Sequence, residues 1–396
     1  MAVGAWEVVA WLSFGAVAYS YAVYPLVLIG GAAVYQIVSD LRFVWRKAER
    51  RERGAHDESP TVQVIIAAFN ERAHIAARMA NLLALDYPQD RLRVLVGSDG
   101  STDGTADILR ELRDPRVDAQ IFPVNRGKAS VLNDLVARSD AQILVFSDAN
   151  TVFDPQAVRR LVAHFRRDEV GAVTGELRLK GAAGDNQDSL YWRYEQMLKM
   201  FEARIGALLG ANGAIYAIRR ELWTPLPPDT ICDDFCIAMD IAAQRRSVIY
   251  EPQAWAEEDT PPEIADEYRR RVRIGIGNFQ ALFRNPRYLG HTSAATAFAY
   301  VSHKVLRWTA PHWLILGLLA SVVLAVWSPF WRGFTGLQLA VYLGAAILYR
   351  RSADGHRISR GLSPLVFLLA LNWAFLVASL RYATGSYQAS WRRTQR

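Results

Sequence analysis

The chain has 396 residues and a net charge of +7, with 51% hydrophobic and 21% charged residues. That length allows one large domain or two ordinary ones. The basic residues cluster beside apolar segments, which indicates a cytoplasmic membrane face, and no zinc-finger spacing or aromatic platform favours a nucleic-acid partner. The two cysteines, Cys232 and Cys236, cannot form a disulfide framework or a four-ligand zinc site, so we expect a reducing compartment.

The N-terminal segment from Trp6 to Val38 carries no charge after Glu7 and is long enough to span a bilayer. It lacks a basic leader and a small-residue cleavage site, so we do not interpret it as a removed signal peptide. Several arginines and a lysine follow, and the positive-inside rule then places the N-terminus outside and the later chain in the cytoplasm. We therefore predict a transmembrane helix over residues 1–41 and a basic cytoplasmic linker over 42–59.

The next part of the chain alternates between strand and helix patterns. The strand candidates are Val62–Ala68, Leu92–Ser98, Ala119–Val124, Gln142–Ser147 and Ala172–Leu177. The helical patterns are Arg72–Leu85, Thr105–Leu112, Ala129–Arg138 and Pro155–Phe165. A spacing of roughly 25–30 residues is that of βα units, so residues 60–180 are predicted to form a doubly wound α/β sheet.

Further elements complete a domain that we place at residues 60–290. An amphipathic helix is predicted over Asp188–Leu209, and a strand over Ala214–Ile218. Then come Asp234–Arg245 as a helix, Val248–Pro252 as a short strand and Glu263–Phe283 as a very basic helix.

The C-terminal third returns to the membrane. An interfacial helix is predicted within residues 291–308, and residues 309–396 form a transmembrane region with a basic tail. The candidate spans are Thr309–Trp327, Gly336–Leu348 and Leu362–Leu380. Arginines at positions 350–360 and 392–396 both favour the cytoplasm, which conflicts with a complete crossing by the last segment. A re-entrant or interfacial final segment would resolve this conflict, which the sequence leaves open.

An apolar run, Ile143–Phe146, is typical of a buried parallel strand and ends in Ser-Asp-Ala-Asn. Ligands of open α/β sheets bind outside the carboxyl ends of the strands. Asp148 and Asn150, two residues apart at such an end, can hold a hard cation beside a phosphate. Taken alone, the same pattern also fits a helix cap or a turn.

Polar loops follow the other strands of the predicted sheet. Asn70 and Glu71 come after the first strand, and Asp99 comes after the second among small residues that suit a ribose or base edge. Arg126 and Lys128 could meet a phosphate. Each of these loops, taken alone, also fits an ordinary turn.

Asp233 and Asp234 are adjacent carboxylates at the predicted start of a helix. Such neighbours raise each other's pKa, which suits a general base. The alternative is that Asp233 caps the helix. The sequence contains no serine nucleophile elbow, H-E-x-x-H or Walker A loop, and no G-x-G-x-x-G follows its first strand, which argues against a dinucleotide oxidoreductase.

The ordered motifs A-A-F-N-E, S-D-G-S-T-D-G-T, N-R-G-K-A, S-D-A-N, G-A-N-G-A-I-Y-A-I-R-R, D-D-F and R-R-R-V-R-I-G-I-G-N-F-Q resemble those of the family 2 glycosyltransferases. The resemblance is greatest to their membrane-integrated branch, which includes cellulose, hyaluronan and poly-N-acetylglucosamine synthases, and it covers residues 60–285 with the flanking membrane segments. It implies a GT-A (Rossmann-like) catalytic domain between transmembrane and interfacial helices, in the bacterial cytoplasmic (inner) membrane. A UDP-sugar donor and Mg²⁺ or Mn²⁺ are implied as well.

The resemblance also implies a role for individual residues. The UDP-sugar would be bound by Ala68, Asn70, Glu71, Asp99, Lys128, Asp148 and Arg270. The metal would be held by Asp148 and by Asn150, which replaces the second acid of the family's D-x-D motif. Asp234, preceded by Asp233, would be the base that deprotonates the acceptor, and Arg273 would meet the leaving diphosphate. The acceptor would contact Asn212, Gly213 and Trp391.

One motif departs from the family pattern. In the family's Q-x-x-R-W motif, Arg270 stands at the glutamine position and Ile274 at the tryptophan position. That tryptophan stacks on the acceptor in processive synthases. The predicted function is an inverting transfer from a UDP-sugar to a growing polysaccharide or a lipid-linked acceptor. The alternatives are a single addition to a lipid-linked acceptor, which Ile274 favours, and a catalytically silent module for polysaccharide export. The sugar, the linkage and the oligomeric state have no signature in the sequence.

Overall fold

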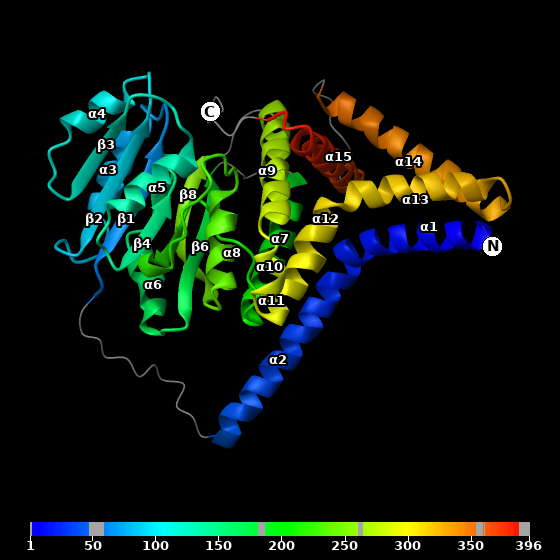
Figure 1. The fold of residues 1–396 in the computed structure, drawn as a ribbon, viewed down its shortest axis with the longest axis horizontal. Coiled ribbons are helices and arrows are strands. Elements are labelled where there is room, and N and C mark those ends of the chain that lie inside the picture. The colour runs from blue at the N-terminus through cyan, green and yellow to red at the C-terminus, as the bar shows by residue number, and fades with distance from the viewer. Residues whose placement is uncertain are drawn as a thin grey trace.

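The computed structural model describes residues 2–46, 59–180, 187–259, 264–353, 359 and 361–387. Figure 1 shows a sheet domain covered by helices, beside a group of helices drawn from both ends of the chain. Most of the predicted linker 42–59 and the acceptor candidate Trp391 lie outside the described residues.

The N-terminal segment is helical throughout but is not one straight span. It comprises α1 (Ala2–Ala18), the π-helical turn η1 (Tyr19–Val23) and α2 (Tyr24–Arg46). The helical stretch Val3–Trp45 has 43 residues, about 65 Å of helix, which is twice the ~30 Å of a bilayer core. In Figure 1, α1 runs beside α13 (Ala310–Ala325), whereas α2 takes a different direction. Because helices bend at π-helical turns, we attribute the change of direction to η1.

The first half of the sheet has the predicted parallel order. β1 (Val62–Ala68), β2 (Leu92–Asp99), β3 (Val117–Phe122) and β4 (Ile143–Ser147) pair in the order β3-β2-β1-β4. β1 and β4 are buried along their whole length, as their continuous apolar runs predict. The helices between them are α3 (Ile75–Leu83), α4 (Thr105–Glu111), α5 (Lys128–Ala137) and α6 (Ala157–Ala163), with the 3₁₀ turn His164–Arg166 after α6.

The second half of the sheet departs from the doubly wound pattern. β7 (Tyr216–Arg219) inserts antiparallel between β4 and β6 (Val170–Lys180), so the predicted fifth strand does not continue the parallel series beside β4. β8 (Ser247–Asp259) is longer than predicted, and the two-residue edge strand β5 (Val152–Phe153) was not predicted. At Gly175 a Cβ atom would lie 2.3 Å from the carbonyl oxygen of Ala254, so only glycine permits this approach of β6 and β8.

The remaining elements connect the sheet to the membrane region. They are α7 (Gln187–Arg204), the 3₁₀ turn Arg220–Leu222, α8 (Asp233–Ala243), α9 (Ile264–Arg284), α10 (Arg287–Gly290), α11 (Ala294–Ala299), the π-helical turn η4 (Tyr300–Val305), α12 (Leu306–Trp308), α13, α14 (Pro329–Ala353) and α15 (Ser363–Ala383). Among the described residues, two helical stretches are long and apolar enough to cross a membrane, Val3–Trp45 and Ser363–Ala383. The pair Ala294–Trp308 and Ala310–Ala325, bent by 61°, would be a third. α14, which contains the predicted span Gly336–Leu348, does not meet the same criterion.

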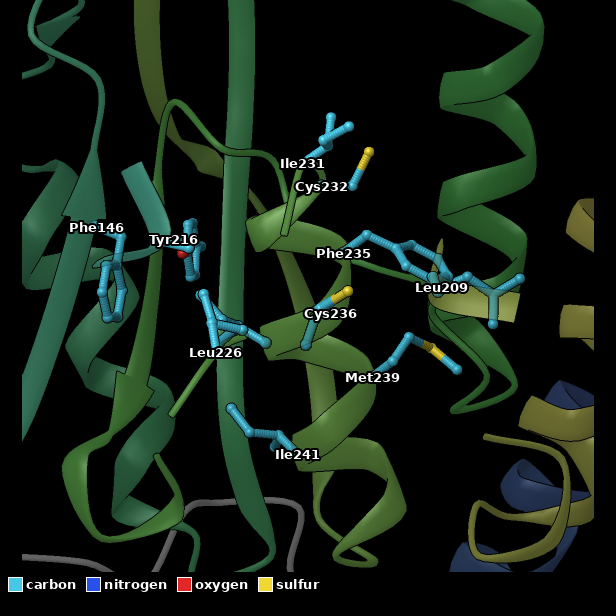
Figure 2. Packing of buried hydrophobic residues seen from close by; sticks show 14 of the residues in the cluster. Phe146, Leu209, Tyr216, Leu226, Ile231, Cys232, Phe235, Cys236, Met239 and Ile241 are labelled. Atoms are coloured by element: carbon cyan, nitrogen blue, oxygen red, sulfur yellow. The ribbon is translucent and has the colours of Figure 1, made fainter. Parts of the chain in front are cut away.

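A single buried cluster joins the sheet to α8 and to the helices beyond it (Figure 2). On the sheet side, the ring of Phe146 stacks on Tyr216 with centroids 4.9 Å apart. On the helix side, Phe235 of α8 packs edge-on against Trp308 at 5.7 Å. Helix α8 is therefore held from both sides, and this fixes the position of the two aspartates in its first turn.

Candidate active site

An ammonium group joins two carboxylates that lie far apart in the sequence. Nζ of Lys128, the first residue of α5, lies 3.0 Å from Oδ1 of Asp148 and 3.2 Å from Oδ2 of Asp233. The exposed fraction of the Asp148 side chain is 38%, against 9% for Asp233. Asp148 is thus the carboxylate that an incoming ligand can reach, while Asp233 stays behind it.

Asp234 is the next residue of α8, and backbone amides hold its carboxylate. Its Oδ2 accepts a hydrogen bond from the Gly213 N–H at 3.0 Å, and its Oδ1 accepts one from the Phe235 N–H at 2.8 Å. Burial, followed by the charge of Asp233, raises the pKa of Asp234 to about 6, against the opposing charge of Lys128. A Cβ atom at Gly213 would lie 3.1 Å from Oδ2, so this close approach suits glycine. The predicted acceptor candidate Gly213 therefore touches the predicted base.

Asp99, at the end of β2, is completely buried and holds the turn that precedes Lys128. Its carboxylate accepts hydrogen bonds from the backbone N–H of Arg126 at 2.9 Å and of Gly127 at 2.8 Å. A carboxylate has about four acceptor positions, and these amides use most of them. The structure thus gives Asp99 a positioning role. Its predicted contact with a uridine can use only the acceptor positions of the carboxylate that these two amides do not occupy.

The loops after β1 and β2 are tied together. Asn70, at φ 55°, donates its backbone N–H to Ser101 Oγ at 3.1 Å and accepts the Thr102 N–H on Oδ1 at 2.8 Å. The Glu71 N–H donates to Thr105 Oγ1 at 2.8 Å. Ala68 is the buried last residue of β1. Because β1, β2 and β4 are parallel, these loops lie at the same edge of the sheet as Asp148.

Asn150 is held by a residue of the distant strand β8. Its Nδ2 donates to Oε1 of Glu258 at 3.0 Å, so its own Oδ1 can face a different group. Asp148 and this Oδ1 are hard oxygen donors of the kind that Mg²⁺ and Mn²⁺ accept. Within the described ranges, no group of three or more His, Cys, Asp or Glu side chains is arranged to hold a metal ion. A cation here would therefore take further ligands from water and from the diphosphate.

The predicted arginines stand on α9, which packs against the start of α8. Arg270 and Arg273 are exposed. Cys232 lies two residues before Asp234. Its thiol donates a hydrogen bond to the carbonyl of Ile274 at 3.6 Å. Gly277 makes this packing possible, since a Cβ atom there would lie 2.5 Å from Cys232 Sγ. Asn212 is held next to Gly213, with its N–H donating to Thr174 Oγ1 at 2.8 Å.

Sequence reasoning missed Arg78, a buried arginine beneath the end of β4. Its Nη2 donates to Ser147 Oγ at 2.7 Å, and its guanidinium carbon lies 4.2 Å from the centre of the Phe153 ring. Burial lowers the pKa of Arg78 to about 9, although the charge of Asp148 opposes this. The available signal was its helical phase, since it shares a face with the buried Ile75 and Leu82.

Comparisons with known proteins place this site in a family. The model of "Glycosyl transferase family 2" matches residues 63–221. That of "Glycosyl transferase family group 2" matches residues 143–377, more than half of the chain. The chain belongs to the family 2 glycosyltransferases. The predicted resemblance is thereby confirmed, and the chain is homologous to polysaccharide synthases.

Individual relatives of this family 2 enzyme are distant. The poly-β-1,6-N-acetyl-D-glucosamine synthase of Staphylococcus epidermidis is 24% identical over 278 residues, which are 66% of this chain and 65% of that protein. Its counterpart in Staphylococcus aureus (strain COL) is 24% identical over 269 residues, 64% of each chain. The chain thus spans slightly less than two thirds of the length of these relatives.

A solved structure confirms the predicted GT-A fold. The mannosyltransferase PcManGT from Pyrobaculum calidifontis, determined in complex with GDP-Man and Mn²⁺, superposes with a TM-score of 0.67 at 21% identity. The match covers 98% of this chain and 100% of that chain, so it includes the helices that flank the sheet domain.

We expect Asp99→Asn to destabilise this family 2 enzyme by about 1–3 kcal/mol, because an amide offers one acceptor oxygen in place of two and leaves a buried backbone N–H unpaired. The purified variant should unfold at a lower temperature than the original protein when thermal unfolding is monitored by intrinsic fluorescence. The matched control is Asp140→Asn, which makes the same change at an exposed residue. Equal melting temperatures for the two variants would contradict the positioning role of Asp99.

Proposed function

We propose that this enzyme transfers a sugar from a UDP-sugar to an acceptor hydroxyl, with inversion at the anomeric carbon and with Asp234 as general base. The observation that carries the proposal is the convergence of Asp148, Asp233 and Asp234 around Lys128 at the ligand-binding edge of the sheet. These groups come from three separated motifs. A silent export module would have no need to keep such a group of charges together.

The proposed base has the protonation state and the fixed position that the reaction needs. A sugar hydroxyl is a poor nucleophile at neutral pH, and a positioned carboxylate removes its proton as the new bond forms. With a pKa of about 6, Asp234 is ionised at pH 7 and is still a stronger base than an ordinary aspartate. Its two amide contacts fix the carboxylate before the acceptor arrives.

Positive charge for the departing nucleotide is available on the donor side. Lys128 lies against Asp148, and Arg273 stands exposed on α9 beside the start of α8. The diphosphate gains negative charge as it leaves, and fixed cations stabilise that charge in the transition state. Arg270 lies three residues before Arg273 on the same helix, and it would add a further contact to the donor. Asn70 and Glu71 would line the nucleotide end of the site.

Asp148 and Asn150 would hold Mg²⁺ or Mn²⁺. When bound, the cation would supply Lewis-acid stabilisation of the leaving diphosphate. The complex of PcManGT with GDP-Man and Mn²⁺ supports the use of a metal together with a nucleotide sugar. It also makes a guanosine donor the alternative to UDP, and turnover with a panel of UDP- and GDP-sugars separates the two.

Two acceptor classes remain to be distinguished. The polysaccharide synthases among the relatives favour a growing polymer as the acceptor. Ile274 favours a single addition to a lipid-linked acceptor, since an aliphatic side chain offers no aromatic face on which a sugar can stack. The length of the product measured by mass spectrometry decides between them.

We further propose that the enzyme lies in the bacterial inner membrane with its catalytic domain in the cytoplasm, and that α15 runs along the interface. α15 lies lengthwise on the basic helix α9. Arg271 stacks on Phe367 at 4.4 Å, and farther along both helices Phe279 stacks on Tyr382 at 6.4 Å. α9 also contacts Cys232 at the start of α8, so α15 is held against the catalytic domain and would follow the membrane surface beside it. This arrangement removes the conflict between the two groups of arginines.

Asp234→Asn should lower the transfer rate by about 10²–10⁴-fold, because the amide cannot take the acceptor proton. Binding of UDP, measured by calorimetry, should stay nearly unchanged, since Asp234 faces the acceptor side. The control is again Asp140→Asn, which should transfer normally. Full transfer activity in Asp234→Asn would remove this residue as the base.

Transfer should depend on pH in a way that reports Asp234. The rate under kcat/KM conditions should rise with pH through about 6, because only the ionised carboxylate is a base. Asp233→Asn removes a negative neighbour and should move this limb to lower pH. Lys128→Gln removes a positive neighbour and should move it to higher pH. If both variants shifted the rising part of the pH–rate profile in the same direction, a group other than Asp234 would control it.

Removal of divalent cations should abolish transfer, because the diphosphate would lose part of its charge stabilisation. The measurement is turnover after treatment with excess chelator, with metal content determined by elemental analysis and with recovery on adding back Mg²⁺ or Mn²⁺. Persistent turnover by protein that contains no metal would refute the proposed metal use.

A further inference from the structure

A cavity lies among the helices of the C-terminal region, and the proposed catalytic residues do not line it. It has a volume of about 560 Å³ and is bounded by α9, α13, α14 and α15. Small-molecule sites typically occupy ~300–1,000 Å³. The proposed reaction does not use this cavity, and none of its lining residues belongs to the proposed catalytic or donor-binding set.

The wall of the cavity is mostly aliphatic. It includes Leu314 and Leu318 of α13, Ala345 of α14, and Val366 and Leu369 of α15. A polysaccharide presents hydroxyl groups on all sides and loses its hydrogen bonds with water when it enters such a wall. Ten of the sixteen lining residues are aliphatic, so the wall matches a hydrocarbon chain better than a sugar polymer, although Tyr342 and Trp373 also contribute rings.

Polar groups gather at one end of the cavity. Tyr349 and Arg350 lie in the last turns of α14, and Tyr268 of α9 lies close to Tyr349. Within the part of the chain that the structure describes, Arg350 has no carboxylate partner. An exposed guanidinium next to a phenol group has the charge and the hydrogen-bond donors that a phosphate requires.

The size of the cavity restricts the kind of lipid. An apolar cavity of about 150 Å³ holds one benzene, so about 560 Å³ is room for on the order of twenty carbon atoms. This is one hydrocarbon chain rather than the two chains of a membrane phospholipid. The cavity and its cationic end together select a lipid with a single chain and a phosphate.

We propose that this cavity receives the hydrocarbon chain of a single-chain lipid phosphate, with the phosphate at Arg350 and Tyr349. The inference rests on the proposed function in one respect, namely that this lipid anchors the acceptor. Helix α9 connects the two places, because Ile274 lies six residues after Tyr268 and its carbonyl binds Cys232, two residues before Asp234. Six residues of helix are about 9 Å, so the end of the cavity at Tyr268 and the contact with the start of α8 lie less than two helical turns apart along α9.

The test is photolabelling of the full-length protein in detergent with a photoreactive prenyl monophosphate, followed by peptide mass spectrometry. The label should fall on α13, α14 and α15. Ala346→Trp fills the cavity and should reduce labelling at least about tenfold. The matched control, Ala340→Trp, places the same side chain on the same helix at an exposed position outside the cavity, and it should label like the original protein.

Two further arms do not depend on the folding of the tryptophan variants. Excess unlabelled prenyl phosphate should compete with the probe, whereas phosphatidylglycerol should not. Arg350→Gln should weaken labelling by the phosphate probe and leave labelling by the uncharged prenol probe unchanged. Equal labelling of Ala346→Trp and Ala340→Trp, or equal competition by phosphatidylglycerol, would overturn the inference. Failure of this inference can be distinguished from failure of the proposed function. Labelling of the cavity does not require sugar transfer, and the transfer assay of Asp234→Asn does not require a lipid in the cavity.

Discussion

The proposed catalytic centre depends on one ammonium group. Asp148, Asp233 and Asp234 bring three carboxylates close together, and such a group repels itself strongly when partly buried. Nζ of Lys128, at 3.0 Å and 3.2 Å from two of them, makes the arrangement tolerable and joins the end of β4 to the start of α8. Burial and the remaining repulsion from Asp233 raise the pKa of Asp234, and a raised pKa is the property that the proposed base requires.

The position of Lys128 is in turn fixed by the backbone. Asp99 binds the amides of Arg126 and Gly127, and Gly127 has the left-handed φ of 91° that directs the chain into α5. On the other side, Phe235 fixes α8 against the membrane-proximal helices (Figure 2). Charge and apolar packing therefore act on neighbouring residues of one helix. The proposed base therefore lies where the sheet meets the helices of the C-terminal region, and not on the sheet alone.

Sequence reasoning predicted the parts of this arrangement that have a short-range signature. The buried strands β1 and β4 appear as apolar runs that end at polar residues, and the first four strands follow the βα spacing. The antiparallel insertion of β7 has no such signature, because pairing of strands separated by some seventy residues is decided by packing in three dimensions. The same holds for the two ion pairs of Lys128 and for the contact of Asn150 with Glu258. Arg78 was missed although its helical phase was visible, since arginine is rarely assigned to a buried face.

Ile274 stands at the position where the family's Q-x-x-R-W motif has a tryptophan, and this difference bears on how the acceptor is held. An acceptor that slides through a synthase must be gripped by its sugars, and an aromatic face provides that grip at each step. Here the backbone carbonyl of Ile274 accepts a hydrogen bond from Cys232 at the start of α8, which carries the proposed base. An acceptor held by a hydrocarbon chain and a phosphate needs no grip on its sugar, because the anchor alone sets the distance to the base. Once one sugar is added, the new terminus lies farther from the same anchor. A fixed anchor beside a fixed base therefore favours a single addition.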